Sequence, residues 1–470
     1  MDQAIRADAP LPPEKPPVKP LPPTPLSWRL GLAAAVVALA VAAYLGRAWL
    51  GPRGQAALGV VCFITAAAVF SANLRAINWH TVAWGFALQV LLALFVIKFE
   101  VFGYRPGYAL FNAAGAVVKK FLQFSDEGAR FVFGSLADPD AMGKTFGAGG
   151  GFVFAFRALP TIIFVSSFFT VLYYFGVLQF VVRVTARVMA LLLRTSGAET
   201  LSVTANVFMG QTEAPLIVKP YVERMTNSEL LALMVGGMAH ISGSLMAVYI
   251  GMGADAVAIL TTSVMASPCT LYLAKIMLPE TERPETLGSV QAPVERGHVN
   301  VIDAAAAGAS DGMRLAINIA AMLIAFLAFI AMVNAALAAC APPGQEWSLA
   351  RVFGWVFAPL AHLLGVEGAD VSKMADLLGT KLVANEFVAY SQLQKMLTTP
   401  DVPPPSPRTV VLASYALTGF ANFASIGIQL GGIGAMAPSR RPDLARLGGR
   451  ALLTGFLVTL VNAAVAGVLL

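Results

Sequence analysis

Nine apolar segments dominate the chain, and most are long enough to cross the hydrocarbon core of a bilayer as a helix, which takes about 20 residues. Charged residues make up only 12% of the 470 residues, whereas soluble domains carry about 25%. The sequence therefore predicts an all-α polytopic membrane protein with about nine spans, at 28–50, 57–72, 81–99, 151–175, 230–252, 256–278, 312–337, 410–430 and 451–470.

The basic residues of the predicted loops fall mostly on one side of this arrangement, including Lys219, Arg224 and Arg440. Cytoplasmic loops carry an excess of Lys and Arg, so the pattern predicts a cytoplasmic N-terminus and a periplasmic C-terminus in a bacterial inner membrane. The same distribution explains the net charge of +6 without a nucleic-acid partner. The proline-rich stretch 1–27 is expected to be a disordered, solvated tail, and 28–50 a retained helix rather than a signal peptide.

Two segments do not behave as simple spans. Residues 195–221 place Glu213 beside a helix-breaking Pro215, and residues 371–396 contain two short apolar pieces that meet near Asn385. An ionisable side chain at membrane depth costs at least about 2.5–3.5 kcal/mol, so Glu213 should face a cavity, a partner or a solute. Non-helical backbone at that depth needs protein or water around it. Both segments are therefore predicted to be re-entrant helical hairpins with buried tips.

Each predicted hairpin is followed by a span that is itself interrupted. The first reads GGMAHISGSLMAVYIG, with Gly243 in mid-helix, and the second reads ALTGFANFASIGIQLGGIG, with Gly419 and Asn422. Paired interrupted segments in the two halves of a chain indicate an inverted-repeat transporter whose binding site lies near the bilayer midplane. The two halves share no obvious residue identity, so this interpretation rests on their pattern.

The residues near these breaks favour a neutral solute with hydroxyl groups or a heterocycle. They supply carboxylates at Glu213 and Glu386, amides at Gln211 and Asn422, and an aromatic ring at Phe420. Amides both donate and accept, carboxylates bind hydroxyl groups strongly, and an aromatic ring packs on a sugar or base face. Structural roles stay open at this stage, because amides also cap broken helices and Phe420 alone would fit a core position.

A channel lined by the same hairpins, or a carrier for another small neutral polar solute, stays open as an alternative function. An enzyme is not expected, because the chain lacks an HExxH motif and any paired nucleophile and base. No cofactor is expected either. The expected parts of the chain are a tail (1–27), N-terminal helices (28–106), an interfacial amphipathic helix and loop (107–149), a scaffold span with a connecting helix (150–194), a first transport part (195–278), a cytoplasmic loop (279–311), a second scaffold span (312–370) and a second transport part (371–470).

Three stretches, GQTEAPLIVKPY, KLVANEFVAY and GFANFASIGIQLGGIG, resemble signature segments of the concentrative nucleoside transporter family. The order of elements is similar to that family from about residue 57 to the C-terminus. The resemblance implies a homotrimer in membrane lipid that imports nucleosides as a secondary active symporter. Each protomer would have a scaffold part and a mobile transport part, and would work by elevator-type alternating access coupled to a downhill cation, usually sodium.

The same resemblance implies roles for particular residues. Those expected to contact the nucleobase are Gln211, Thr212, Glu213 and Leu245, and those expected to hold the ribose are Glu386, Phe420, Asn422 and Ser425. The expected sodium ligands, some through backbone carbonyls, are Asn206, Met209, His240 and Ile241.

His240 departs from the family pattern, which commonly has a small hydroxyl residue there. Sodium prefers oxygen ligands, and an imidazole titrates near neutral pH. Two hypotheses follow for the coupling ion. Either a proton is carried by His240, Glu213 or Glu386, or only the backbone carbonyl of His240 matters and sodium still binds.

Overall fold

The computed structural model describes residues 22–470 with gaps at 147–152, 289–297, 343–344, 346 and 400–402. The described residues form twenty α-helices and three short 3-10 turns, η1 (Leu74–Ala76), η2 (Gly134–Ala137) and η3 (Pro438–Arg440). Only two isolated β-bridges occur among them. The prediction of an all-α protein is therefore confirmed, whereas most of the predicted tail (1–27) lies outside the described residues.

Seven segments of the described chain are long and apolar enough to cross a membrane. They are α1 (Leu26–Leu45), α2 (Arg47–Val69), α3 (Trp79–Ile97), α11 with α12 (Asn227–Ala239 and Gly243–Gly251), α13 (Ala256–Met277), α14 (Val301–Ala339) and α20 (Arg441–Leu469). Helices α6 (Phe154–Tyr174) and α7 (Val177–Leu193) meet at a bend of 72°, and they are long and apolar enough to cross a membrane only when taken together. The count is thus seven to eight rather than the nine expected.

The predicted span 151–175 counts only as part of the bent pair α6 and α7, and the predicted span 410–430 is not a single helix. It is divided into α18 (Pro407–Leu417) and α19 (Phe423–Met436), each too short to cross alone. Gly419 has a φ of +128°, a backbone conformation that side chains disfavour, and the side chain of Asn422 caps α19 by accepting a hydrogen bond from Ser425 N at 3.0 Å. A turn glycine followed by a strong N-cap ends one helix and starts the next.

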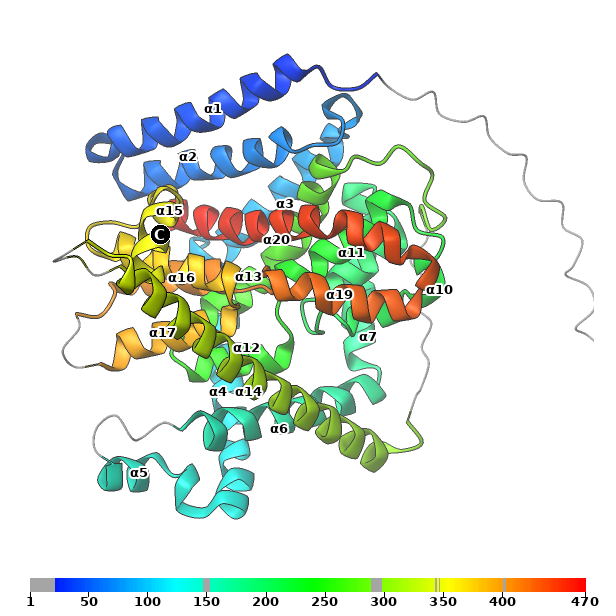
Figure 1. Ribbon diagram of the computed structural model, residues 1–470. Coiled ribbons are helices and arrows are strands. Elements are labelled where there is room, and N and C mark those ends of the chain that lie inside the picture. Colours follow the sequence, from blue (N-terminus) through cyan, green and yellow to red (C-terminus); the bar gives the residue numbers. More distant parts are fainter. Residues whose placement is uncertain (1–21, 147–152, 289–297, 343–344, 346, 400–402) are drawn as a thin grey trace, which may run out of the picture.

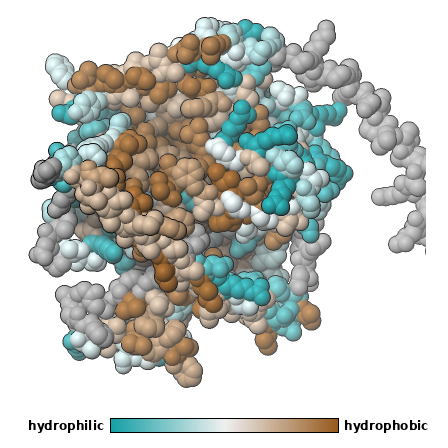
Figure 2. Space-filling model, viewed as in Figure 1, coloured by the Kyte–Doolittle hydropathy of each residue, from teal (hydrophilic) through white to brown (hydrophobic). Residues whose placement is uncertain are grey.

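The central helices are α11, α12, α13 and α20, whose residues are almost all buried, whereas α1 and α14 are mostly exposed. In Figure 1, α1 and α2 lie side by side across the upper edge of the molecule, and the long helix α14 runs diagonally through the lower half beside α6. Apolar side chains cover much of the visible face, and hydrophilic ones gather near α10 (Lys219–Val222) and the start of α20 (Figure 2). An apolar belt with polar ends suits a bilayer.

The predicted amphipathic helix after the third span is present as α4 (Pro106–Phe133). It packs against α6 and α13, and α5 (Pro139–Phe146) follows it. Whether α4 lies at the membrane interface stays a prediction.

The same order of elements occurs twice. In the first half α8 (Gly197–Ala205), a break and the short helices α9 (Ala214–Ile217) and α10 precede the broken helix α11–α12 and then α13. In the second half, after α15 (Leu349–Leu363), the elements are α16 (Asp370–Val383), α17 (Glu386–Thr398), the broken helix α18–α19 and α20. This repetition agrees with the two-half pattern read from the sequence.

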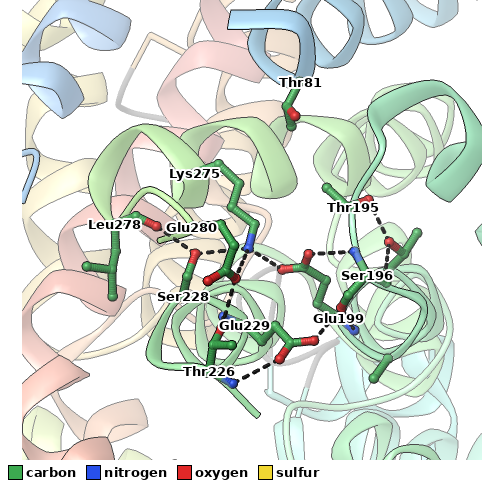
Figure 3. A network of polar contacts seen from close by, with 12 residues as sticks. Thr81, Thr195, Ser196, Glu199, Thr226, Ser228, Glu229, Lys275, Leu278 and Glu280 are labelled. Atoms are coloured by element: carbon green, nitrogen blue, oxygen red, sulfur yellow. Dashed lines mark hydrogen bonds and ion pairs between the residues drawn. The ribbon is translucent and has the colours of Figure 1, made fainter. Parts of the chain in front are cut away.

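A buried ionic network fixes the base of α8 (Figure 3). The ammonium group of Lys275, near the end of α13, lies 2.8 Å from Glu199, 3.2 Å from Glu280 and 2.9 Å from Ser228 Oγ. Glu199 and Glu229 complete capping boxes with Ser196 and Thr226, at the starts of α8 and α11, as in the general motif. The network therefore joins the N-terminal ends of α8 and α11 to the C-terminal end of α13. The C-terminal end of α8 lies away from this network.

Candidate solute-binding site

A cavity of about 530 Å³ lies where the two hairpin tips meet the two broken helices. Its lining includes all eight side chains that the resemblance assigned to solute: Gln211, Thr212, Glu213, Leu245, Glu386, Phe420, Asn422 and Ser425. These residues are separated by up to 214 positions in the chain, so their convergence is a property of the fold. Ser242, Asn385 and Phe387 also line the cavity.

The two helix breaks cross in direct backbone contact. Phe420 N donates a hydrogen bond to His240 O at 3.3 Å, which joins the α18–α19 break to the α11–α12 break. A methyl group on Gly419 would lie 2.9 Å from Met238 O and 3.0 Å from Ala239 O. Only glycine therefore lets the two backbone segments approach this closely. Their crossing brings residues of both halves to one cavity.

Three helices begin at the cavity wall with capped N-termini. Ser242 caps α12 through Leu245 N at 3.4 Å, Asn385 caps α17 through Val388 N at 2.9 Å, and Asn422 caps α19. Helix N-termini carry partial positive charge and unpaired N–H groups. They surround the cavity with donors that complement the carboxylates of Glu213 and Glu386.

The carboxylate of Glu386 is held from two sides. Its Oε1 accepts a hydrogen bond from Tyr249 OH at 3.0 Å, and its Oε2 accepts one from Asn422 Nδ2 at 3.1 Å. Tyr249 in turn stacks on Tyr390, with ring centroids 4.2 Å apart. A carboxylate can accept about four hydrogen bonds, so Glu386 keeps acceptor capacity for hydroxyl groups in the cavity.

A chain of amides crosses between the halves. Gln211 Nε2 donates to Ser425 Oγ at 3.3 Å, while Gln429 Nε2 lies 3.4 Å from Gln211 Oε1 and 2.9 Å from Met234 O. Glu213 lies close by and accepts a hydrogen bond from Gly210 N at 3.1 Å. The side chain of Gln211 is therefore oriented before any solute arrives.

The residues expected to bind a cation lie at two helix ends. Asn206 is the C-cap of α8 and His240 the C-cap of α11. Asn206 Nδ2 donates to Ser202 O at 2.9 Å, and its buried Oδ1 has no hydrogen-bond partner among the described residues. Phe208 O accepts a hydrogen bond from Gly243 N at 3.0 Å, which holds the hairpin tip against α12.

The imidazole of His240 is hydrogen-bonded within the protein through both ring nitrogens. Its Nδ1 lies 2.9 Å from Gly236 O, so it donates, and its Nε2 lies 3.2 Å from Ser267 Oγ on α13. Both ring nitrogens are thus used inside the protein. The backbone carbonyl of His240 and the side-chain oxygen of Asn206 are the groups with the right chemistry for a hard cation.

One wall of the cavity was not anticipated from the sequence. It is formed by α14 residues Leu315, Asn318, Ile319 and Ala321, which belong to a segment read as a plain apolar span. The amide of Asn318 within that run was the only available signal. Tyr249 and Gln429 were also missed, because each acts through a partner, Glu386 or Gln211, that is distant in the chain.

Broken helices that cross inside a helical membrane protein, and enclose a polar cavity between two similar halves, define the class of secondary transporters. Three family models match the chain: "Na+ dependent nucleoside transporter N-terminus" over residues 58–136, "Nucleoside recognition" over 155–256 and "Na+ dependent nucleoside transporter C-terminus" over 258–467.

Similar proteins agree with these models. An uncharacterized transporter of Haemophilus influenzae is 42% identical, with 87% of this chain and 96% of that protein aligned. Sodium/nucleoside cotransporter 1 of Mus musculus is also 42% identical, over 87% of this chain and 63% of its own length. The chain thus spans less than two thirds of the mouse relative.

Solved structures are similar over nearly their whole length. CNTnw in an inward-facing substrate-bound state is 41% identical, aligns with 88% of this chain and 97% of its own, and gives a TM-score of 0.82. A variant of CNTnw in an outward-facing state gives a TM-score of 0.83 at 41% identity and the same coverage. The chain belongs to the concentrative nucleoside transporter family, a family of transporters rather than enzymes.

Proposed function

We propose that this protein is a sodium-coupled symporter that imports nucleosides across the bacterial inner membrane. The observation that carries the proposal is the single cavity in which Glu386, Asn422, Ser425 and Gln211 converge with the ring of Phe420. Hydroxyl groups of a sugar suit the carboxylate and amides, and a planar base suits the aromatic and amide surfaces. The cavity volume of about 530 Å³ lies within the usual range for small-molecule sites, about 300–1,000 Å³.

Within this cavity the nucleobase contacts Gln211, Thr212, Glu213 and Leu245, which come from the first hairpin tip and from α12. The ribose contacts Glu386, Phe420, Asn422 and Ser425, from the second tip and the α18–α19 break. The hydrogen bonds from Tyr249 and Asn422 to Glu386 support this division, because they orient the carboxylate for a sugar hydroxyl.

The coupling ion is sodium, bound at the ends of α8 and α11 by Asn206, Met209, His240 and Ile241, with His240 acting through its backbone. The unpartnered buried Oδ1 of Asn206 supports an oxygen ligand there. Both ring nitrogens of His240 are engaged, with Gly236 and Ser267, so a proton carrier facing the solute would have to be Glu213 or Glu386, which line the cavity. Sodium bound here fixes the first hairpin tip against α12, and so prepares the nucleobase contacts.

Transport follows an elevator-type cycle in a homotrimer. The two hairpins are re-entrant and move with their broken helices, while α14, α6 and the N-terminal helices form the scaffold in membrane lipid. The N-terminus is cytoplasmic and the C-terminus periplasmic. The exposed apolar surfaces of α1 and α14 support contact with lipid or with neighbouring protomers.

Uptake of labelled uridine into proteoliposomes tests the proposal. An inward sodium gradient should accumulate uridine above the outside concentration, replacement of sodium by choline should abolish accumulation, and a protonophore should leave it unchanged. Glu386→Ala serves as the inactive control in the same membranes. Uptake that only equilibrates, with or without sodium, would identify a channel; accumulation driven by a pH gradient in choline would identify proton coupling.

A further inference from the structure

Lys381 is a fully buried charged residue that the proposed transport mechanism does not yet use. It lies in the last turn of α16, just before the second hairpin tip, and its side chain is 0% exposed. Its Nζ donates to Ala416 O at 2.7 Å and to Thr459 Oγ1 at 2.9 Å. Within the described parts of the chain, no ion pair neutralises it. Glu386 is near enough to interact with Lys381 electrostatically but forms no ion pair with it. A buried charge without a contacting carboxylate needs a specific reason.

The groups closest to this ammonium group are dipoles and an aromatic ring. Ala416 lies in the last turn of α18, where carbonyls lack helical partners and carry partial negative charge. The neighbouring carbonyl of Ser414 accepts hydrogen bonds from Tyr390 OH at 3.1 Å and Thr418 Oγ1 at 2.6 Å. The ring of Phe456 lies 5.7 Å from Lys381 Nζ, within range of a cation–π interaction.

The equivalent place in the first half holds oxygen atoms instead of an ammonium group. There the end of α8 packs against the last turn of α11, so closely that a methyl group on Gly236 would lie 3.1 Å from Asn206 Nδ2. Asn206 Oδ1 is buried there without a partner. In the second half the end of α16 packs against the last turn of α18, and Lys381 brings its own positive charge to the carbonyls.

We propose that Lys381 is a tethered cation, which takes in the second half the place that the coupling cation takes in the first. The ammonium group joins α16 to α18 and α20, and so keeps Asn385 and Glu386 in position against the α18–α19 break. This inference rests on the proposed function for the cation in the first half. Only the cation of the first half then exchanges with the solution. The first hairpin tip is ordered when that ion binds, whereas the second tip is ordered permanently by Lys381.

Two variants separate the charge of Lys381 from its volume. Lys381→Met keeps most of the length and removes the charge, while Lys381→Ala also leaves space beside Ala416 O and Thr459 Oγ1. The measurement is uridine affinity by calorimetry at saturating sodium, with propylammonium chloride or choline chloride added at equal ionic strength. Both variants should bind uridine at least about tenfold more weakly, since a charge-assisted hydrogen bond is lost.

Propylammonium should restore a large part of the uridine affinity of Lys381→Ala, and choline should not. The affinity of Lys381→Met should respond to neither salt, because the methionine side chain fills the space. Affinity of Lys381→Met within about twofold of wild type would overturn the proposal, as would loss in both folded variants without rescue by propylammonium. If neither variant folds, Thr459→Val keeps the lysine and removes one of its acceptors. It should then weaken uridine binding without changing the sodium concentration for half-saturation, and unchanged uridine affinity would overturn the proposal.

The test also distinguishes this inference from the proposed function. Wild-type protein that fails to bind uridine refutes the nucleoside proposal. In that case the thermal unfolding midpoint of Lys381→Ala, with propylammonium against choline, still measures the tethered cation. A rise with propylammonium alone supports it, and equal midpoints refute it.

Discussion

The replacement Glu386→Gln tests the ribose assignment most directly. The carboxylate accepts hydrogen bonds from Tyr249 and Asn422 at 3.0 and 3.1 Å, and its remaining acceptor sites face the cavity. Glutamine has nearly the same shape but changes one acceptor oxygen into a donor and removes the charge. A hydrogen bond to a charged group contributes about 1.5–3 kcal/mol, so loss of one ribose contact should weaken binding about 10- to 150-fold.

Calorimetry with uridine and 2′,3′-dideoxyuridine measures this effect. The dideoxy compound lacks the sugar hydroxyls, so its affinity should be nearly the same for the variant and the wild type. Tyr249→Phe is the matched control, because it removes one hydrogen bond to Glu386 while keeping the charge, and it should weaken uridine by only a few fold. Equal weakening of both ligands by Glu386→Gln, or none of either, would refute the assignment of Glu386 to the ribose.

Three other replacements probe separate parts of the structure. Lys275→Met leaves the carboxylate of Glu199 buried without its partner and should lower stability by about 3–5 kcal/mol, measured as a drop in the thermal unfolding midpoint that the added change Glu199→Gln partly reverses. Gly237→Ala places a methyl group 2.9 Å from Gln211 Cβ, so uridine affinity should fall while the sodium concentration for half-saturation stays near the wild-type value. His240→Gln should keep sodium-driven uptake with an unchanged pH profile, since the ring bonds only within the protein; sodium-independent uptake at low pH in the wild type alone would contradict this.

The sequence predicted the residues that line the cavity better than it predicted the contacts that hold them in place. Local patterns mark where helices must break, because Pro215, Gly419 and capping residues such as Asn422 act on their own neighbours. Contacts between the halves, such as Phe420 N with His240 O, join residues far apart in the chain, and no local pattern encodes them.

The same limit applies to the predicted span 410–430 and to His240. The span 410–430 was counted as one crossing although the residues of its break were recognised, because hydropathy averages over a break. The two hypotheses for the coupling ion rest on the residue type of His240, whereas the hydrogen bonds of its ring to Gly236 and Ser267 depend on the fold. The burial of Lys381 is not predictable from the sequence, since a lysine near a helix end is usually solvated.

The cavity wall contributed by α14 has a mechanical consequence. This helix packs chiefly along α6, and its lining residues, among them Leu315 and Ile319, are mostly apolar. The described residues of the two halves are joined by hydrogen bonds, as between Gln211 and Ser425, and by the packing of α11 and α13 against α20. A slide of both halves past α14 would therefore uncover the solute along one side while those hydrogen bonds stay intact. Apolar surfaces can exchange one set of contacts for another at little cost, so a displacement of the halves along this wall would require little free energy. The distance travelled would then set the width of the opening to the solute.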